Sequence, residues 1–410
     1  MRCALLGGPP ETSSGEAGPR LDDPRASGVE AGREAGPGAA GGWAGPGAAG
    51  SWAGSEPQLV ERIRDEILAS AGQRITFARF MERALTEPGL GYYVTSEVRP
   101  TRLGDYLSAP ELHPFFGRCV GRFLTAAWQR AGCPEAFTVH EHGAGRGTLR
   151  DSVRAGLDLD ASELAGVLSW QALDVPGRGA ARSERAADVV LANEYLDALP
   201  VHRVVQDGEL HEAYVGWLDG WFGEVIDGPS TPALAQHLEA DGVTLAEGQR
   251  AEIGLAAELW MRRVAGEAGL VIVIDYGHEA RQLYGPQRMS GTLLTYREHR
   301  LGDAPFAAVG RTDISAHVDV TAIDRAARAA GLSRLGSTDQ ARFLAGLGLG
   351  ELLADLGRSR GTELDAYLVA RAAVARLLDP RHLGGFRVLA WGHDVDAGRP
   401  ASLPGFGSGS

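Results

Sequence analysis

A glycine-rich turn contains the residue types best suited to holding a ligand. Glu141 lies near the end of the predicted strand FTVHEH, and Gly143, Gly145 and Gly147 follow before a predicted helix. A G-x-G-x-x-G dinucleotide fingerprint would need its third glycine where Thr148 stands. An acidic residue two places before G-x-G-x-G instead indicates an S-adenosylmethionine (SAM) site, because glycines admit the ligand and Glu141 attracts its cationic end. A tight turn without a ligand is the alternative.

Two further predicted strands end in acidic or amide side chains. Asp174 lies near the end of SWQALDV, the next predicted strand after the glycine turn, where a carboxylate can bind both ribose hydroxyls. Asn193, Glu194 and Asp197 follow the strand ADVVLA. The carboxyl ends of parallel strands meet at one edge, so we predict Asp174 and Asn193 as cofactor-binding residues. Glu194 and Asp197 either hold a cationic substrate or only cap the next turn.

Composition limits the classes of function. The 410 residues include 40 basic residues, all arginine, and 53 acidic residues, for a net charge of −13. This charge argues against binding nucleic acid through its phosphates. No uninterrupted apolar run is long enough for a membrane-spanning helix, and the three cysteines form no C-x-x-C pair, which predicts free thiols. The absence of lysine leaves carboxylates, histidine, tyrosine or water as proton acceptors.

Two histidines alternate in the strand before the glycine turn. His140 and His142 are two positions apart and therefore lie on one face of the strand. A metal site generally needs at least a third protein ligand, and none is near in the sequence. We therefore predict packed or solvated histidines and no metal site.

The elements that must position these residues alternate between strands and helices. Strands are predicted at FTVHEH, SWQALDV, ADVVLANE, GLVIVIDYG and FRVLAWG, with helices between several of them, which predicts an α/β doubly wound sheet. Residues 201–268 form a predicted insertion that covers the ligand side and includes a hairpin at Asp207-Gly208. An N-terminal helical region at 57–135 precedes the core at 136–395. The Gly/Ala/Pro-rich residues 1–55 and residues 396–410 are predicted to be disordered tails.

Several segments together resemble the MidA-type methyltransferase family. The segment from Gly104 to Glu111, GDYLSAPE, with Phe116-Gly117 after it, is similar to the signature of that family. The family order continues with GLGYY before it and with five later segments: EHGAGRGTL, NEYLDALPVH, DYGH, GRTDISAHVDV and LLDPRHLGGF. The resemblance extends over about residues 58–391, which is far more specific than the glycine turn alone.

The resemblance implies a Rossmann-like class I methyltransferase that uses SAM as methyl donor. Mitochondrial members symmetrically dimethylate a protein arginine, so the implied partner is a protein that presents an arginine; a small molecule is the other option. Carboxylates suit a guanidinium, which makes Glu194, Asp197 and Glu111 the catalytic candidates in that order. Tyr276 and His278 are candidates for shaping the pocket or accepting the proton. We also expect a bacterial, cytoplasmic protein rather than a mitochondrial one, with no membrane or nucleic-acid partner, and a homodimer as one option.

The sequence departs from the family pattern at two places. The family motif E-[LIV]-G-P-G-x-G has His142 and Ala144 here in place of the apolar residue and the proline. Residues 175–188, between the second and third predicted strands, are too few for the usual helix, strand and helix. Three readings therefore stay open: an arginine methyltransferase, a methyltransferase for small molecules or other residues, and an assembly factor that has lost its activity.

Overall fold

The computed structural model describes residues 52, 54–95, 108–174, 186–297, 300–302, 304–359, 363–393 and 403–407. All of them belong to one compact unit, Gly42–Ser410. Most of the two predicted tails, the Gly104 to Leu107 part of the signature and the link 175–185 lie outside the described residues. Within the part of the chain that the structure describes, no helix is long and apolar enough to cross a membrane.

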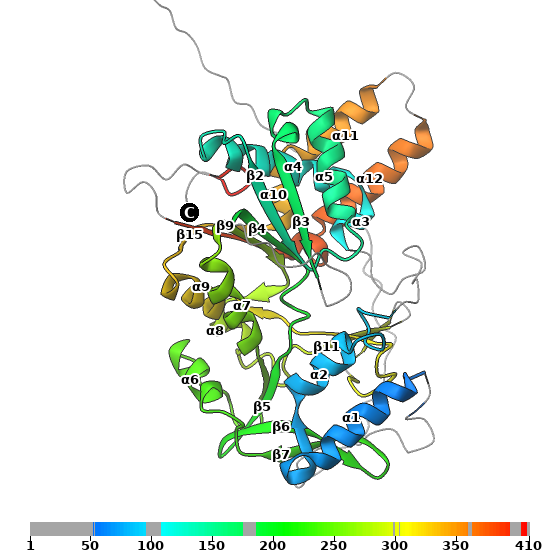
Figure 1. The fold of residues 1–410 in the computed structure, drawn as a ribbon, viewed down its shortest axis with the longest axis vertical. Coiled ribbons are helices and arrows are strands. Elements are labelled where there is room, and N and C mark those ends of the chain that lie inside the picture. The colour runs from blue at the N-terminus through cyan, green and yellow to red at the C-terminus, as the bar shows by residue number, and fades with distance from the viewer. Residues whose placement is uncertain are drawn as a thin grey trace, which may run out of the picture. The chain divides into compact units, whose positions relative to one another are not determined.

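A six-stranded sheet forms the centre of the molecule (Figure 1). Its order is β15 (Ser333–Asp339), β16 (Arg387–Gly392), β9 (Ala268–Asp275), β4 (Ala187–Asn193), β2 (Phe137–His142) and β3 (Leu168–Leu173). The last four strands run parallel, and β16 and β15 are antiparallel to their neighbours. From β2 the chain continues to β3 on one side and then to β4 on the other. A ligand crevice is expected where the strand order reverses in this way.

Helices cover both faces of this sheet and explain its apolar strands. In Figure 1, α4 (Phe115–Arg130), α5 (Thr148–Leu159), α10 (Gln340–Gly346), α11 (Leu349–Arg358) and α12 (Leu364–Leu378) lie above it. Below it lie α7 (Leu255–Ala265) and α9 (Val320–Ala329). Along β9, Leu270, Ile272 and Ile274 pack on the first side and Val271 and Val273 on the second. Alternate residues of a strand face opposite sides, so burial on both sides requires a continuous apolar run. The predicted α/β class is confirmed.

A second, antiparallel sheet organises the residues of the predicted insertion. Strand β6 (Glu209–Leu218) pairs with β5 (His202–Asp207), β7 (Trp221–Asp227) and β1 (Arg74–Thr76), and β5 also pairs with β8 (Arg250–Ile253). The predicted hairpin at Asp207-Gly208 is present: Asp207 pairs with Glu209, and Gly208 takes a positive φ of 67°. Glycine suits this position, because tight turns between antiparallel strands commonly need a positive φ.

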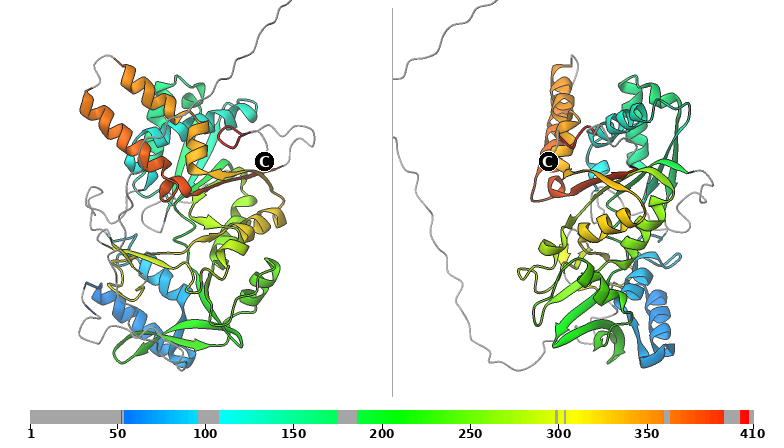
Figure 2. Two further views of the ribbon diagram at one scale, coloured as in Figure 1. Left: turned by 180° about the vertical axis from the view of Figure 1, so that it is seen from behind. Right: turned by 90° about the vertical axis from the view of Figure 1, so that its left-hand side faces the viewer.

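The N-terminal helices belong to this second sheet. Helices α1 (Pro57–Ala69) and α2 (Phe77–Thr86) lie beside its strands (Figure 2) and share a buried cluster with Val215 and Phe222. The Thr76 side chain caps α2 by accepting the Arg79 N–H at 3.1 Å. By contrast α3 (Ala109–Leu112) and α4 pack on the central sheet. The residues 57–135, expected as one helical region, therefore contribute to two separate cores.

Three chain segments make up what we call the second lobe: 54–95, 201–254 and 277–316. The third segment adds β11 (Leu294–Arg297), β12 (Arg300–Gly302) and β13 (Asp313–Ser315). At the junction with the central sheet, β10 (Gly277–His278) pairs with β14 (Val318–Asp319). The remaining short elements are α6 (Ala233–Ala240), α8 (Ala280–Leu283), η1 (Ala71–Gln73), η2 (Glu163–Gly166) and η3 (Leu383–Gly385).

Candidate active site

A cavity of about 740 Å³ lies at the carboxyl edge of the central sheet. This volume falls within the usual range for small-molecule sites. Both lobes supply its wall: Glu82, Leu85, Thr86, Tyr93, His142, Gly143, Gly145, Leu173, Asp174, Glu194, Tyr195, Ala198, Leu199, Pro200, Arg263 and Glu267. The sheet contributes the ends of three neighbouring strands, so the cavity occupies the crevice that the topology predicts.

The glycine turn uses backbone conformations that favour glycine. Gly143, Gly145 and Gly147 have φ values of 71°, 53° and 77°. A Cβ on Gly143 would lie 2.6 Å from Cδ2 of Tyr195, so no larger residue fits there. A Cβ on Gly145 would meet no atom within 4 Å, which leaves room beside the backbone for a ligand. Gly147 begins α5 as its N-cap residue.

Asp174 connects the end of β3 to this turn. Its Oδ2 accepts the N–H of Gly145 at 2.9 Å, and its side chain also lines the cavity. The carboxylate therefore fixes the conformation of the turn from the end of β3, and its binding of a ribose stays a prediction. Asn193, by contrast, is buried at the end of β4 and donates from Nδ2 to Glu194 Oε1 at 3.2 Å.

Glu141 lies beneath the turn and is not among the cavity-lining residues. Its Oε2 accepts the indole N–H of Trp170 at 2.8 Å. Burial raises the pKa of this carboxyl to about 7, against the opposing effect of the Trp170 hydrogen bond. The approach of Glu141 to a ligand stays a prediction.

Glu194 brings a carboxylate to the cavity wall at the end of β4. Its backbone takes a positive φ of 52°, which is uncommon outside glycine and is typical of strained functional positions. Oε1 accepts the N–H of Ala109 at 2.9 Å in addition to the Asn193 amide. Burial, with a smaller effect of the Asp275 charge, raises the pKa of Glu194 to about 8. The side chain can therefore hold or release a proton near neutral pH.

Asp275 organises the loop that follows Glu194. Its Oδ2 lies 3.1, 2.7 and 3.3 Å from the N–H groups of Tyr195, Leu196 and Asp197, and Oδ1 accepts the Tyr276 N–H at 2.8 Å. Burial still raises the pKa of this carboxyl to about 6. Asp275 is not among the site residues predicted from the sequence. Its place at the end of β9, next to β4 in the sheet, is the signal that could have identified it.

Asp197 completes the acidic group formed by Glu194, Asp197 and Asp275. Burial raises the pKa of Asp197 well above its usual range, and the charges of Asp275 and Asp313 add to the effect. Asp313 comes from β13 of the second lobe and accepts the Tyr93 hydroxyl at 2.7 Å. Tyr93 and Asp313 lie in the segments GLGYY and GRTDISAHVDV, but the local sequence does not indicate their role, because only the packing of the second lobe brings them to the site.

The other predicted catalytic residues, Glu111, Tyr276 and His278, are not among those that line the cavity. Glu111 forms a capping box with Ser108 at the start of α3, next to the Ala109 N–H that binds Glu194. Tyr276 packs against Phe386 and His317, with ring centroids 4.0 and 5.6 Å apart. His278 Nε2 lies 2.9 Å from Arg288 Nη2. Neither Tyr276 nor His278 lines the cavity, so the structure brings Glu194 to it and keeps these two in a separate aromatic group.

His142, one of the two residues that depart from the family motif, lines the cavity. Its Nδ1 lies 3.1 Å from the indole N–H of Trp260, and its ring packs edge-on against Tyr195. Burial lowers the pKa of His142 to about 4, so the imidazole is neutral at ordinary pH. The side chain thus contributes a wall of the pocket and an acceptor for Trp260.

Comparison with known proteins agrees with this arrangement. A family model described as "Putative S-adenosyl-L-methionine-dependent methyltransferase" matches residues 154–338. The fold also matches a crystal structure from Burkholderia thailandensis, described as a superfamily member and "likely methyl transferase" bound to S-adenosyl-homocysteine. That match has a TM-score of 0.72 and 31% identity and covers 84% of this chain and 94% of that one. The chain belongs to the MidA-type family of SAM-dependent methyltransferases.

Curated relatives of this MidA-type methyltransferase are named for arginine methylation. The "Protein arginine methyltransferase NDUFAF7 homolog, mitochondrial" of Drosophila melanogaster is 27% identical over 391 residues, covering 81% of this chain and 84% of the relative. The human "Protein arginine methyltransferase NDUFAF7, mitochondrial" is 28% identical over 324 residues, covering 67% and 70%.

These matches confirm the predicted family, the enzyme class and the cofactor, SAM. The class I methyltransferase-like fold is confirmed as well. The residues of this MidA-type chain fit the cofactor, because Gly145 leaves open space beside the backbone in a cavity that Asp174 also lines.

Proposed function

We propose that the protein methylates the guanidinium of an arginine in a protein substrate, in the symmetric pattern implied by the family. One observation supports this most directly: a single cavity is lined by the glycine turn, by Asp174 and by Glu194. SAM supplies the methyl group, and we assign its binding to Gly143, Gly145, Gly147 and Asp174. The names of the curated relatives agree with arginine as the acceptor.

The acidic group suits a guanidinium both in charge and in shape. Arginine stays protonated at neutral pH, with a pKa above about 12, and its planar fork matches a carboxylate. In our proposal Glu194 holds this fork from the cavity wall, with Asp197 behind it. Burial raises the pKa of Glu194 to about 8, so its carboxyl is protonated at neutral pH when the site is free. A bound guanidinium would lower this pKa and leave a charged carboxylate. The same carboxylate would then accept the proton that the arginine loses.

The second lobe supports a role as cover for the acceptor. Glu82, Leu85 and Thr86 of α2 line the cavity together with Tyr93, opposite the sheet edge. Their side chains would contact a substrate and exclude water from the reacting atoms, which methyl transfer requires. In this proposal Asp275 positions the loop after Glu194, and Glu111 holds the segment whose Ala109 N–H binds Glu194.

Four further residues, the cellular setting and the oligomeric state also belong to this proposal. Glu141 and Asn193 remain predicted cofactor-binding residues. Tyr276 and His278 remain predicted to shape the pocket or accept the proton, from outside the residues that line the cavity. The bacterial, cytoplasmic setting and the homodimer also remain predictions.

Two measurements test the proposal in sequence. Calorimetry with SAM on the purified full chain should detect binding, and no binding would favour the assembly-factor reading. Mass spectrometry of lysate proteins after incubation with labelled SAM should then find label on arginine. Label only in small metabolites would instead establish a small-molecule methyltransferase.

A further inference from the structure

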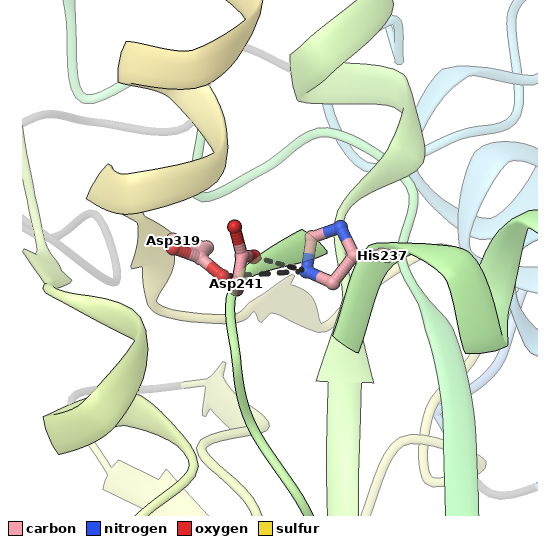
Figure 3. A group of neighbouring side chains, drawn as sticks. All are labelled: His237, Asp241 and Asp319. Atoms are coloured by element: carbon pink, nitrogen blue, oxygen red, sulfur yellow. Dashed lines mark ion pairs between the residues drawn. The ribbon is translucent and has the colours of Figure 1, made fainter. Parts of the chain in front are cut away.

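A second cluster of ionisable side chains lies apart from the active-site cavity. His237 comes from α6, Asp241 follows that helix, and Asp319 ends β14 (Figure 3). One nitrogen or oxygen atom from each lies within 4.8 Å of those of the other two. None of the three lines the 740 Å³ cavity. We call these residues the junction cluster, because they join the second lobe to the start of α9.

The distances within the junction cluster match a tetrahedral metal site. His237 Nε2 lies 3.4 Å from Asp241 Oδ2 and 3.3 Å from Asp319 Oδ2. Zinc binds nitrogen and carboxylate oxygen at about 2.0–2.2 Å with tetrahedral angles, which separates neighbouring ligand atoms by about 3.4 Å. Figure 3 shows both carboxylates directed at the same ring nitrogen. Both nitrogen–oxygen separations are therefore those expected of ligand atoms that share one ion.

The histidine is oriented as metal-binding histidines are. Its other nitrogen, Nδ1, lies 2.7 Å from Glu258 Oε1 on α7. A carboxylate in this position fixes the tautomer and directs Nε2 toward the metal. The Tyr284 hydroxyl lies 2.9 Å from Nε2 and 3.4 Å from the Glu252 carbonyl oxygen, so its proton can go to that carbonyl when Nε2 binds an ion.

The carboxylates supply an independent observation. Both oxygens of Asp241 and Oδ2 of Asp319 are buried without a hydrogen-bond partner, and the two side chains are 0% and 5% exposed. Asp319 Oδ1 already accepts the Ala322 N–H that begins α9, so only Oδ2 is directed into the cluster. Buried carboxylate oxygens almost always have a partner, and a bound cation would provide one.

Nearby arginines approach only those carboxylate oxygens of Asp241 and Glu258 that are not directed at the Nε2 atom of His237. Arg325 Nη2 lies 3.3 Å from Asp241 Oδ1 and 3.5 Å from Glu258 Oε1, in neither case with hydrogen-bond geometry. Arg262 pairs with the other oxygen of Glu258 at 3.0 Å. The Oδ2 atoms of the two aspartates thus face His237, and the arginines approach from elsewhere.

We propose that His237, Asp241 and Asp319 bind one divalent metal ion of the zinc class. One imidazole and two carboxylates suit zinc better than magnesium or calcium, which prefer oxygen ligands alone. The ion fixes the end of α6 to the start of α9 and so holds the second lobe on the central sheet. The sequence alone does not reveal the cluster, because His237 and Asp319 lie on distant segments of the chain with several strands and helices between them.

Zinc titration of the full-length chain, stripped of metal with a chelator, tests the site. Calorimetry should find one zinc ion per chain, and His237→Gln and Asp241→Asn should each lose that binding. His382→Gln is the matched control, since His382 pairs with Asp379 at 3.2 Å on the surface with 70% of its side chain exposed. This control should bind zinc like the wild type. Binding equal in all four proteins, or none in the wild type, would show a buried charge network only.

Two measurements on the wild type keep the test valid if the variants do not fold. Cobalt in place of zinc should give the intense visible absorption of a tetrahedral ion; the weak spectrum of hydrated cobalt would overturn the proposal. Zinc at about 100 times its dissociation constant should raise the thermal midpoint by roughly 4 °C. An unchanged midpoint would equally contradict a structural metal site. Both readouts are independent of methyl transfer.

Discussion

Two buried groups of carboxylates in this protein are built in different ways. At the sheet edge, Glu194 and Asp275 accept backbone N–H groups and lie beside an open cavity. In the junction cluster, Asp241 and Asp319 Oδ2 have no donor and lie closed off from solvent. Backbone donors beside an open cavity suit a site that binds a cationic substrate. Buried carboxylate oxygens without donors instead need positive charge nearby, which His237 and Arg325 supply in part and which the proposed ion would complete.

The largest expected effect concerns the glycine turn beside the open cavity. Gly143→Val should abolish SAM binding, because the added side chain would overlap Tyr195 and the positive φ of 71° disfavours a branched residue. Strain of this kind costs about 1–3 kcal/mol, and where the strained turn itself contacts the ligand this corresponds to about 5- to 150-fold in affinity before the overlap is counted. Calorimetry with SAM measures the loss.

Gly208→Val is the control for this substitution. Gly208 has a similar φ of 67° but lies in the β5–β6 hairpin with nothing within 4 Å of its Cβ position. The control should keep its SAM affinity despite similar strain. If both variants lose binding alike, general destabilisation is responsible and the turn is not the cofactor site.

The sequence predicts those features of the molecule that depend on local residue type, and it does not predict those that depend on distant segments. The apolar run 270–274 and the glycine turn contain their own signals, since strand burial and positive φ depend on local residue type. The pairing of β1 with β6 joins Thr76 to Tyr214, and no local pattern specifies such a partner. The raised pKa of Glu194 likewise depends on burial and on Asp275, which belongs to a different strand. Residue types at the strand ends were predictable, whereas their environment depended on distant segments.

The second prediction separates chemistry from cofactor binding. Glu194→Gln keeps the side-chain oxygen that can accept the Ala109 N–H but removes the charge and the proton acceptor. Turnover should fall by about 100-fold or more, the usual size of a general-base effect, while SAM affinity stays unchanged. Steady-state kinetics on the methylated arginine substrate, with SAM calorimetry alongside, measures both. Unchanged turnover would remove Glu194 from the catalytic group; Glu163→Gln, an exposed carboxylate, serves as control.

The third prediction concerns the backbone N–H groups that bind Asp275 at the sheet edge. Asp275→Asn replaces one of two oxygens that together accept four N–H groups, so at least one donor loses its partner. The free energy of unfolding should fall by about 2 kcal/mol, as for other hydrogen bonds to buried charges. Urea denaturation measures it. Asp339→Asn should change little, because asparagine also caps a helix well and Asp339 caps α10; equal losses in both would argue against a special role of Asp275.

The smallest expected effect is a pH dependence of stability that arises from Glu194. Its pKa is about 8 in the folded protein against an ordinary value of 4.5, so between these values the folded state binds the proton more tightly. Stability therefore falls as pH rises from about 5 to 8, and Glu194→Gln should remove part of that fall. Since one pKa unit corresponds to about 1.4 kcal/mol, even a partial shift predicts a difference of about 1 kcal/mol between the two proteins across this range. Urea midpoints at both pH values test it. Parallel curves would mean that Glu194 is already ionised in the free enzyme, and the sheet-edge group would then resemble the junction cluster in needing a resident cation.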